Sequence, residues 1–293
     1  MLSAHKIATL AQVTGLTAAT LCVALVATPS QANAYSLNGW DYAIGGSNNG
    51  SGGSVFDYKG IAIKESGDSI FVALNTNMTL QGSLYNNKEV INYGDLFFNF
   101  TGKSFKAASD AGQLVGIHFA TNGSQSGVSQ VGVYSNVKAK STTAQNYGYA
   151  NLTKWSDWTK TTNKGAYNDS FGDLTARDSY FAGQQSGSGT ILNAIQSGQK
   201  VSDIFMMSSA DLQAAGLNFA QFGGNGSQTL GFSFKRTADF KVGSFVANLF
   251  AECGNDGLAI RSNLHKVPEP TTMAGIAAVA GLGLLGRRRR RAA

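Results

Sequence analysis

Few residues of this 293-residue chain have the types and spacing that catalysis requires. A general base is most often a histidine or one of two facing carboxylates in a pocket. His118 is the one histidine away from the two ends of the chain, and it alternates with Val115, Ile117 and Phe119. In a strand with this pattern His118 points away from the apolar face. We therefore expect a partly solvated side chain and no catalytic role.

Sequence motifs also argue against an enzyme. The chain contains no Gly-x-Ser-x-Gly, no His-Glu-x-x-His and no P-loop, which excludes the best-marked hydrolases, zinc proteases and nucleotide enzymes. A glycosidase needs only two facing carboxylates, but no spacing in this sequence selects a pair. We predict a protein that is not an enzyme, and an envelope glycosidase is the less favoured alternative.

Calcium is the metal best suited to an exported domain rich in oxygen ligands. The candidate ligands are Asp169, Asp173 and Asp178, which share one short segment, and Asp256. None of them follows the Asp-x-Asp-x-Asp-Gly pattern of a calcium loop, so capping and turn roles are favoured. The sequence predicts no cofactor, leaves Ca²⁺ as a candidate, and leaves any metal ligands unknown.

Tryptophans could provide stacking platforms for sugars. Trp155 and Trp158 lie three residues apart among polar residues, and Trp40 is the third tryptophan. We name Trp155 and Trp158 as the candidate glycan-binding pair, with exopolysaccharide as the ligand. Burial against a sheet is the alternative, because it is the commoner position of tryptophan.

Alternation of apolar and polar residues predicts half-buried strands. In Thr229–Lys235, for example, Leu230, Phe232 and Phe234 share one face. This pattern, or a high content of β-branched and aromatic residues, predicts about seven strands in all. They are residues 55–64, 69–75, 95–100, 115–119, 128–137, 229–235 and 243–250.

A middle stretch, residues 145–222, carries the helical signals. Ser208 or Ser209 can cap a short helix that ends at Gly216, and Thr190–Gln196 predicts a second helix. No long polar linker separates the early strands from the late ones. We therefore predict one mostly β domain, a β-sandwich or jelly-roll-like fold over residues 35–262, with one or two short helices in a middle insertion. Late strands would complete a sheet that early strands begin.

The first 34 residues are typical of a secretory signal peptide. A positively charged start and an apolar run over residues 7–27 precede the small residues Ala32 and Ala34, which suit a signal peptidase. This pattern predicts cleavage before Tyr35. A retained membrane helix is the alternative.

The tail, residues 263–293, resembles a membrane anchor. Pro268, Glu269 and Pro270 precede an apolar run over residues 271–286, which as a helix would be about 24 Å long. Five arginines follow and should remain on the cytoplasmic side, since positive charge resists export: Arg287, Arg288, Arg289, Arg290 and Arg291. An N-terminal signal peptide and a tail with this orientation predict export of the residues between them.

The tail resembles the PEP-CTERM sorting signal of bacteria that have an exosortase. In that family the Pro-Glu-Pro tripeptide is the recognition and processing site. The resemblance implies a temporary membrane anchor that exosortase removes. Four segments of the body also look like PEP-CTERM surface proteins of the cyanobacterial type, a group without a known biochemical activity: residues 39–44, 94–100, 132–137 and 252–257.

Net charge and cysteines change when the predicted targeting segments are removed. The chain carries a net charge of +6. Removal of Lys6 and the five arginines leaves 17 of its 23 Lys and Arg residues, and removal of Glu269 leaves 16 of its 17 acidic residues. A nearly neutral body without a basic stripe argues against nucleic-acid binding. Cys253 alone remains, because Cys22 precedes residue 34, and we expect it to be buried and inert. A disulfide between two chains or a metal ligand is the alternative.

These observations predict a surface or extracellular-matrix protein with a non-catalytic structural or adhesive role. Its expected partners are signal peptidase, exosortase, the membrane and, as an alternative function, exopolysaccharide. It would be held at the cell surface or outer envelope, or released from it.

Overall fold

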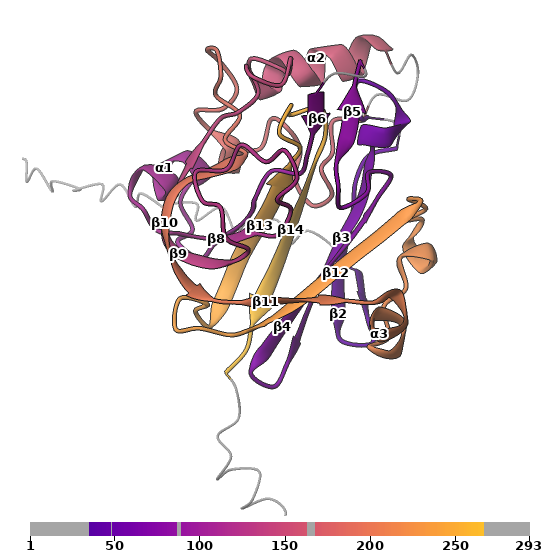
Figure 1. Ribbon diagram of the computed structural model, residues 1–293, viewed down its shortest axis with the longest axis vertical. Helices are drawn as coiled ribbons and strands as arrows, with labels where there is room; N and C mark the ends of the chain where they lie inside the picture. Colours follow the sequence, from indigo (N-terminus) through magenta and orange to yellow (C-terminus); the bar gives the residue numbers. More distant parts are fainter. Residues whose placement is uncertain (1–34, 48, 87–88, 163–167, 267–293) are drawn as a thin grey trace, which may run out of the picture. The chain divides into compact units, whose positions relative to one another are not determined.

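The computed structural model describes residues 35–47, 49–86, 89–162 and 168–266. The described residues form two six-stranded antiparallel sheets and a short hairpin (Figure 1). The first sheet has, in spatial order, β1 (Tyr35–Leu37), β2 (Trp40–Ile44), β3 (Tyr58–Ser66), β4 (Ser69–Thr76), β12 (Gln228–Lys235) and β11 (Ile204–Met207). The second has β10 (Ala194–Ser202), β9 (Gly132–Lys140), β8 (Leu114–His118), β7 (Leu96–Asn99), β13 (Gly243–Phe250) and β14 (Gly257–Leu264).

Shorter elements connect the strands. The hairpin consists of β5 (Ser83–Tyr85) and β6 (Glu89–Ile91). The α-helices are α1 (Phe105–Asp110), α2 (Leu152–Thr162) and α3 (Ser209–Ala214). Three single turns of 3-10 helix occur at Ser54–Phe56, Ser179–Phe181 and Phe219–Phe222. The predicted mostly β fold class is confirmed, and the sheets are antiparallel.

Alternating residues build the core between the two sheets. Phe232 and Phe234 of β12 lie opposite Val72 and Ile70 of β4, and all four side chains are buried on the inner face. The second sheet contributes side chains such as Phe98 to the same cluster. Burying one such side chain contributes about 2 kcal/mol, so the alternation in sequence decides which face of each strand turns inward.

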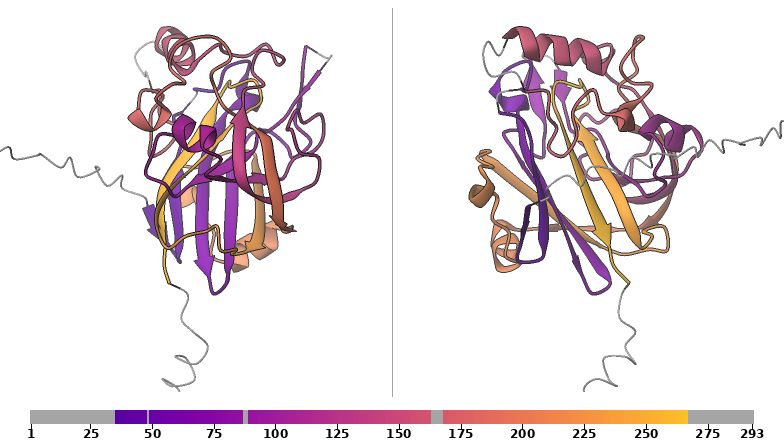
Figure 2. Two further views of the ribbon diagram at one scale, coloured as in Figure 1. Left: turned by 90° about the vertical axis from the view of Figure 1, so that its left-hand side faces the viewer. Right: turned by 180° about the vertical axis from the view of Figure 1, so that it is seen from behind.

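The outer faces of both sheets are covered as well (Figure 2). On the second sheet, Phe97 packs against Phe105 of α1, and the same cluster includes Trp155 of α2. On the first sheet, Leu212 of α3 packs with Trp40 and Phe219. A sheet buried on both faces has fewer polar outward positions, which weakens the two-residue pattern in its strands.

The late strands complete both sheets, as predicted. β12 pairs with β4 and β11, and β13 pairs with β7 and β14. The predicted segments 69–75, 229–235 and 243–250 correspond closely to β4, β12 and β13. Residues 95–100, 115–119 and 128–137 correspond in part to β7, β8 and β9, while 55–64 begins with a 3-10 turn before β3.

Two predictions for the middle stretch differ in outcome. The helix after Ser208 is confirmed, since α3 begins at Ser209 and the Ser208 side chain accepts the backbone N–H of Asp211. The helix predicted for Thr190–Gln196 is wrong, because residues from Ala194 onward form β10, which pairs with β9. The stretch therefore contains strands β10 and β11 as well as helices, and α1 lies outside it.

The targeting segments predicted from the sequence lie outside the described residues. These are the signal peptide with Ala32 and Ala34, and the tail with Pro268, Glu269, Pro270, the apolar run and Arg287 to Arg291. Tyr35 is described: it begins β1, is half exposed, and stacks on Phe222 with ring centroids 4.9 Å apart. In the described part of the chain, no helix combines the length and apolar character needed to cross a membrane.

Candidate functional site

The expectation of a solvated His118 is wrong. Its side chain is only 2% exposed, and its Nδ1 lies 2.7 Å from Asp95 Oδ1. The other oxygen of Asp95 accepts hydrogen bonds from the Ser126 hydroxyl and from the Ile195 N–H. The Ser126 hydroxyl thus bonds to the carboxylate, which is not the Ser–His–Asp order of a nucleophilic triad. Asp95 joins β8, β10 and the loop between β8 and β9.

The tryptophans predicted as a glycan platform are largely inside the protein. Trp155 is completely buried, and its indole N–H donates to the Asn255 carbonyl at 2.8 Å. Trp40 is also buried and donates to the Ala215 carbonyl. Trp158 is half-buried beside Tyr149, with ring centroids 6.2 Å apart. Trp155 therefore offers no exposed ring to a sugar, and the prediction that Trp155 and Trp158 form a glycan-binding pair is wrong for Trp155.

The four aspartates considered for calcium have local structural roles. Asp169 accepts the Ser156 hydroxyl, and Asp178 caps the turn at Ser179 and pairs with Arg261. Asp173 accepts the Arg261 N–H, and burial raises its pKa to about 6. Asp256 is buried and accepts the Tyr58 N–H. Within the described ranges, no three His, Cys, Asp or Glu side chains gather in a way that could hold a metal ion.

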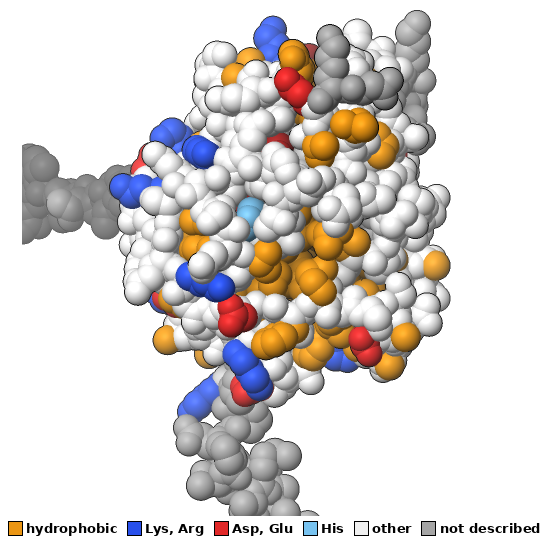
Figure 3. All heavy atoms as spheres, viewed as in Figure 1, with side chains coloured by type: hydrophobic (Ala, Val, Ile, Leu, Met, Phe, Trp, Pro, Cys, Tyr) orange, Lys and Arg blue, Asp and Glu red, His pale blue; other side chains and the backbone are white. Residues whose placement is uncertain are grey.

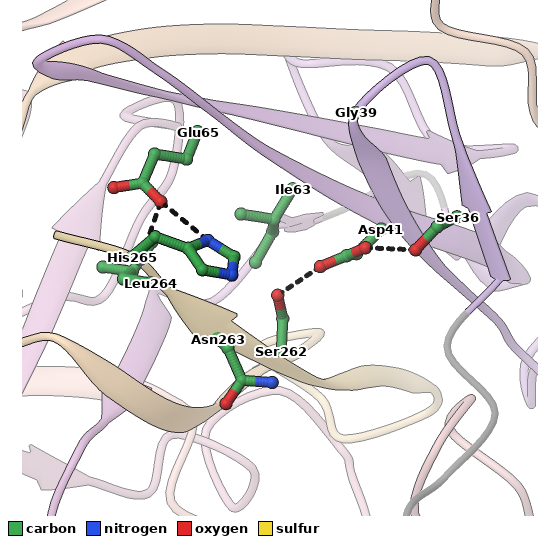
Figure 4. A pocket seen from close by; sticks show the side chains of 9 residues that line it. All are labelled: Ser36, Gly39, Asp41, Ile63, Glu65, Ser262, Asn263, Leu264 and His265. Atoms are coloured by element: carbon green, nitrogen blue, oxygen red, sulfur yellow. Dashed lines mark hydrogen bonds and ion pairs between the residues drawn. The ribbon is translucent and has the colours of Figure 1, made fainter. Parts of the chain in front are cut away.

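One cavity, of about 300 Å³, brings two carboxylates near the C-terminal end of β14 (Figure 4). Asp41 accepts hydrogen bonds from Ser36 and Ser262, one on each carboxylate oxygen. Glu65 pairs with Arg236 through one oxygen and accepts the His265 N–H at 2.8 Å through the other. All four oxygens are therefore engaged in joining β1, β2, β3 and β14. These hydrogen bonds and the ion pair give both carboxylates a structural role at the junction of the strands.

A second cavity, of about 220 Å³, lies among tyrosines, and we call it the tyrosine pocket. Tyr85, Tyr147 and Tyr149 line it together with one aliphatic residue and several small or amide residues: Ile91, Ser51, Gly52, Asn146, Gly148 and Asn255. These residues come from the β5–β6 hairpin, the turn before α2, the loop before β3 and the β13–β14 connection. A pocket built from four separate segments depends on the completed fold.

The rings of Tyr85 and Tyr147 form the outer wall of the tyrosine pocket. Their centroids are 5.8 Å apart and their planes are tilted by 34°. Tyr85 is half-buried, whereas Tyr147 is 69% exposed, the highest exposure among the large apolar side chains described. Figure 3 shows apolar side chains gathered over β5 and β6, at the end of the molecule away from where β14 ends.

The backbone of Tyr147 is held in an unfavourable conformation. Its φ is +54°, and the other non-glycine residues with positive φ in the described part are all asparagines: Asn38, Asn86 and Asn136. Asparagine tolerates the left-handed region, whereas a bulky residue there costs about 1–2 kcal/mol. The Gly148 N–H donates to the Thr143 carbonyl and closes the turn around Tyr147. Strain of this kind is characteristic of functional sites.

The turn is fixed against the β13–β14 connection. A Cβ at Gly148 would lie 1.8 Å from the Cys253 carbonyl oxygen, so only glycine fits this approach. The Tyr149 N–H donates to that same oxygen at 3.3 Å. Cys253 is completely buried, which confirms the expected buried cysteine, and this burial raises the pKa of its thiol to about 12. The exposed ring of Tyr147 therefore extends from a rigid base.

Hydrogen-bonding groups at the pocket are partly unused. The Tyr149 hydroxyl donates to Ser51 Oγ at 2.8 Å. The side-chain amide of Asn255 and the hydroxyls of Tyr85 and Tyr147 form no hydrogen bond with any described residue. These three groups can bond to a ligand without breaking a contact within the protein.

A buried polar network lies behind the tyrosine pocket. The Gln125 side chain donates to Asn146 Oδ1 at 3.0 Å, and the Gln125 N–H donates to Glu252 Oε1 at 2.6 Å. Burial, with a smaller effect of the Asp95 charge, raises the pKa of Glu252 to about 7. Its other oxygen, Oε2, has no hydrogen-bond partner among the described residues. The network fixes Asn146, which precedes Tyr147.

No known protein family, curated protein or solved structure matches this chain. No residue of the tyrosine pocket was predicted from the sequence to be part of a site. One local signal was available, because Asn146-Tyr147-Gly148-Tyr149 places a tyrosine directly before glycine in a Gly- and Asn-rich region. That signal indicates a turn, but only the fold brings Tyr85 to it.

Proposed function

We propose that the chain is an exported surface protein whose body has a non-catalytic, adhesive role at the cell envelope or in the extracellular matrix. In this proposal residues 1–34 are a signal peptide. The tail anchors the protein through residues 271–286 until exosortase cleaves near Pro268-Glu269-Pro270. The body is a β-sandwich that stands outside the membrane.

One observation carries the adhesive part of the proposal. The described chain ends just after β14 at one end of the two sheets, whereas β5 and β6, which border the tyrosine pocket, lie at the opposite end (Figures 1 and 2). A domain tethered to the membrane through residues 265–266 would therefore present the pocket away from the membrane. Exposed tyrosine rings at such a position suit contact with other molecules.

The engaged carboxylates support a role other than catalysis. Asp41 and Glu65 hold strands together, and His118 and Asp95 bond to one another in the interior. Catalytic acids and bases need access to a substrate proton. A surface protein needs instead a rigid body and an accessible contact region.

The experiment that tests the proposal measures the intact mass of the protein in surface, membrane and medium fractions. We expect a chain that begins at Tyr35 and ends near Pro268. A Glu269→Ala variant should remain in the membrane fraction with its tail attached, and Glu89→Ala is a matched control because Glu89 is an exposed acid in β6. Recovery of the native protein from the cytosol with Met1 and Ala293 intact would contradict the proposal.

A further inference from the structure

The tyrosine pocket combines three properties of a ligand site that do not depend on one another. It is hollow, with a volume of about 220 Å³. An aromatic wall borders it, and that wall stands on the strained backbone of Tyr147. The unused amide of Asn255 lies on its lining. Packing alone explains none of these, because a folded protein covers large rings and avoids left-handed tyrosine.

The geometry of the wall indicates how a ligand would stack. Tyr85 and Tyr147 are too close, at 5.8 Å between centroids, for another ring to enter between them. A ligand would therefore stack on an outer face of this ring pair and not between the rings. Flat or gently curved apolar faces pack on such a surface, and the C–H face of a pyranose ring is one of them.

The charge of the described lining residues restricts the class of ligand further. None of the nine described residues that line the pocket is charged. An anionic sugar would need an arginine, a lysine or a metal ion to compensate its desolvation, and a cation would need a carboxylate. The lining instead offers hydroxyl, amide and backbone groups, which match the hydroxyl groups of an uncharged sugar.

From these observations we propose that the tyrosine pocket binds one sugar unit of a neutral polysaccharide. The sugar stacks on Tyr85 and Tyr147 and bonds to the Asn255 amide. The cavity is smaller than the roughly 300 Å³ at which sites for drug-sized ligands begin, which suits a single ring of a longer chain. This inference rests on the proposed surface role, because it names the partner that the exposed end would hold.

The test uses the protein purified from the envelope or medium as the cell processes it. Four probes are compared by isothermal titration calorimetry: cellohexaose, maltohexaose, and the neutral and acidic fractions of the cell's own exopolysaccharide separated by anion exchange. We expect at least one neutral probe to bind and the acidic fraction to bind at least about tenfold more weakly, since the described residues of the lining include no cation to compensate an anion.

Variants separate stacking from other effects. Tyr147→Asn keeps a residue that tolerates positive φ and removes the ring, so affinity should fall about tenfold. Tyr85→Ala should have a similar effect, and Tyr85→Phe, which retains the ring, should bind more tightly than Tyr85→Ala. Leu84→Ala is the matched control, because Leu84 is an exposed apolar residue of the same strand outside the pocket lining, and its affinity should equal that of the unaltered protein.

Two results would overturn the inference. One is the absence of binding to every neutral probe, and the other is equal affinity in the Tyr147→Asn and Leu84→Ala variants. Either result, obtained with a protein that the mass analysis places at the surface, removes the sugar site and leaves the surface role standing. A protein recovered from the cytosol that binds neutral sugars would instead contradict the surface role and leave the sugar site standing.

Discussion

Tyr147 carries a conflict between backbone conformation and side-chain exposure. The left-handed φ opposes folding, and a ring that is 69% exposed buries little area to offset that cost. We predict that Tyr147→Asn raises the free energy of unfolding by about 0.5–1 kcal/mol, because asparagine relieves part of the strain. Urea denaturation measures this change.

The matched variant for that measurement is Tyr85→Ala. It removes the ring contact with Tyr147 but leaves the backbone of Tyr147 as it is. Because Tyr85 is half-buried and also packs against the core between the sheets, we expect Tyr85→Ala to destabilise the protein by about 1–2 kcal/mol. Destabilisation of both variants by the same amount would show that the ring contact, and not the backbone, dominates at Tyr147.

Glu252 should make stability depend on pH. Its pKa is raised from 4.5 to about 7 in the folded state, so the native protein binds more protons than the unfolded chain between these values. Stability is therefore greatest below about pH 4.5 with respect to this group and falls as the pH rises through 7. Glu252→Gln removes the ionisation and should flatten the fall by roughly 1–3 kcal/mol between pH 5 and 8.

Urea denaturation at several pH values measures that difference. Asp173, with a pKa of about 6, and Asp256, whose pKa is also raised by burial, act in the same direction. The comparison is therefore the difference between the unaltered protein and Glu252→Gln, with Asp173→Asn as a second reference. Parallel curves for the unaltered protein and Glu252→Gln would show that Glu252 does not titrate in this range.

Among the elements, α3 is a short helix that depends on its cap. The Ser208 hydroxyl accepts the Asp211 N–H at 3.2 Å, and Asp211 accepts the Ser208 N–H in return. We predict that Ser208→Ala destabilises the protein by about 1 kcal/mol, since Leu212 of α3 covers the first sheet. Thermal unfolding measures the loss. Ser209→Ala, one residue later, removes a hydroxyl outside the cap and should change little.

The strand β11 lies at the edge of the first sheet and carries apolar residues. It pairs only with β12, its register is regular, and Phe205 and Met206 are exposed. Such an edge promotes association between molecules. We predict that Phe205→Lys changes the free energy of unfolding by less than about 0.5 kcal/mol but raises the protein concentration at which aggregates form on mild heating.

Light scattering at several protein concentrations measures that threshold. A matched control is Gln199→Lys in β10, the edge strand of the second sheet, where three register shifts already disrupt pairing. Equal thresholds for Phe205→Lys and Gln199→Lys would exclude β11 as the site of association.

Local sequence was sufficient to predict those elements whose residues carry a strand alternation or a helix cap. β12 and β13 alternate cleanly, and Ser208 marks the start of α3. β10 was mistaken for a helix because its residues have no strand pattern, and pairing with β9 decides its conformation. His118 pointed to the predicted face, but a loop that local sequence does not position buries it. The tyrosine pocket was missed because it joins residues distant in sequence.

At the scale of the whole molecule, the reactivity of the Cys253 thiol measures whether the packing between the two sheets is intact. It belongs to the core between the sheets and is completely buried, and its pKa of about 12 suppresses the reactive thiolate. We predict that a thiol reagent labels the processed, folded protein at least about a thousandfold more slowly than the urea-unfolded protein. Fast labelling of the native protein would show that the β13–β14 connection opens locally.

The interleaved strand order has a consequence for biosynthesis. β12 completes the first sheet between β4 and β11, and β13 separates β7 from β14 in the second sheet. A ribosome or a translocation channel that releases the chain from its N-terminus therefore delivers strands whose neighbours have not yet emerged. The first sheet cannot close until Lys235 is free, and the second cannot close until Leu264 is free. The consecutive strands β1 to β4 and β7 to β9 can pair as they emerge, but the core between the sheets stays open until β12 and β13 arrive. Long-range pairing is therefore delayed until most of the chain has left the channel.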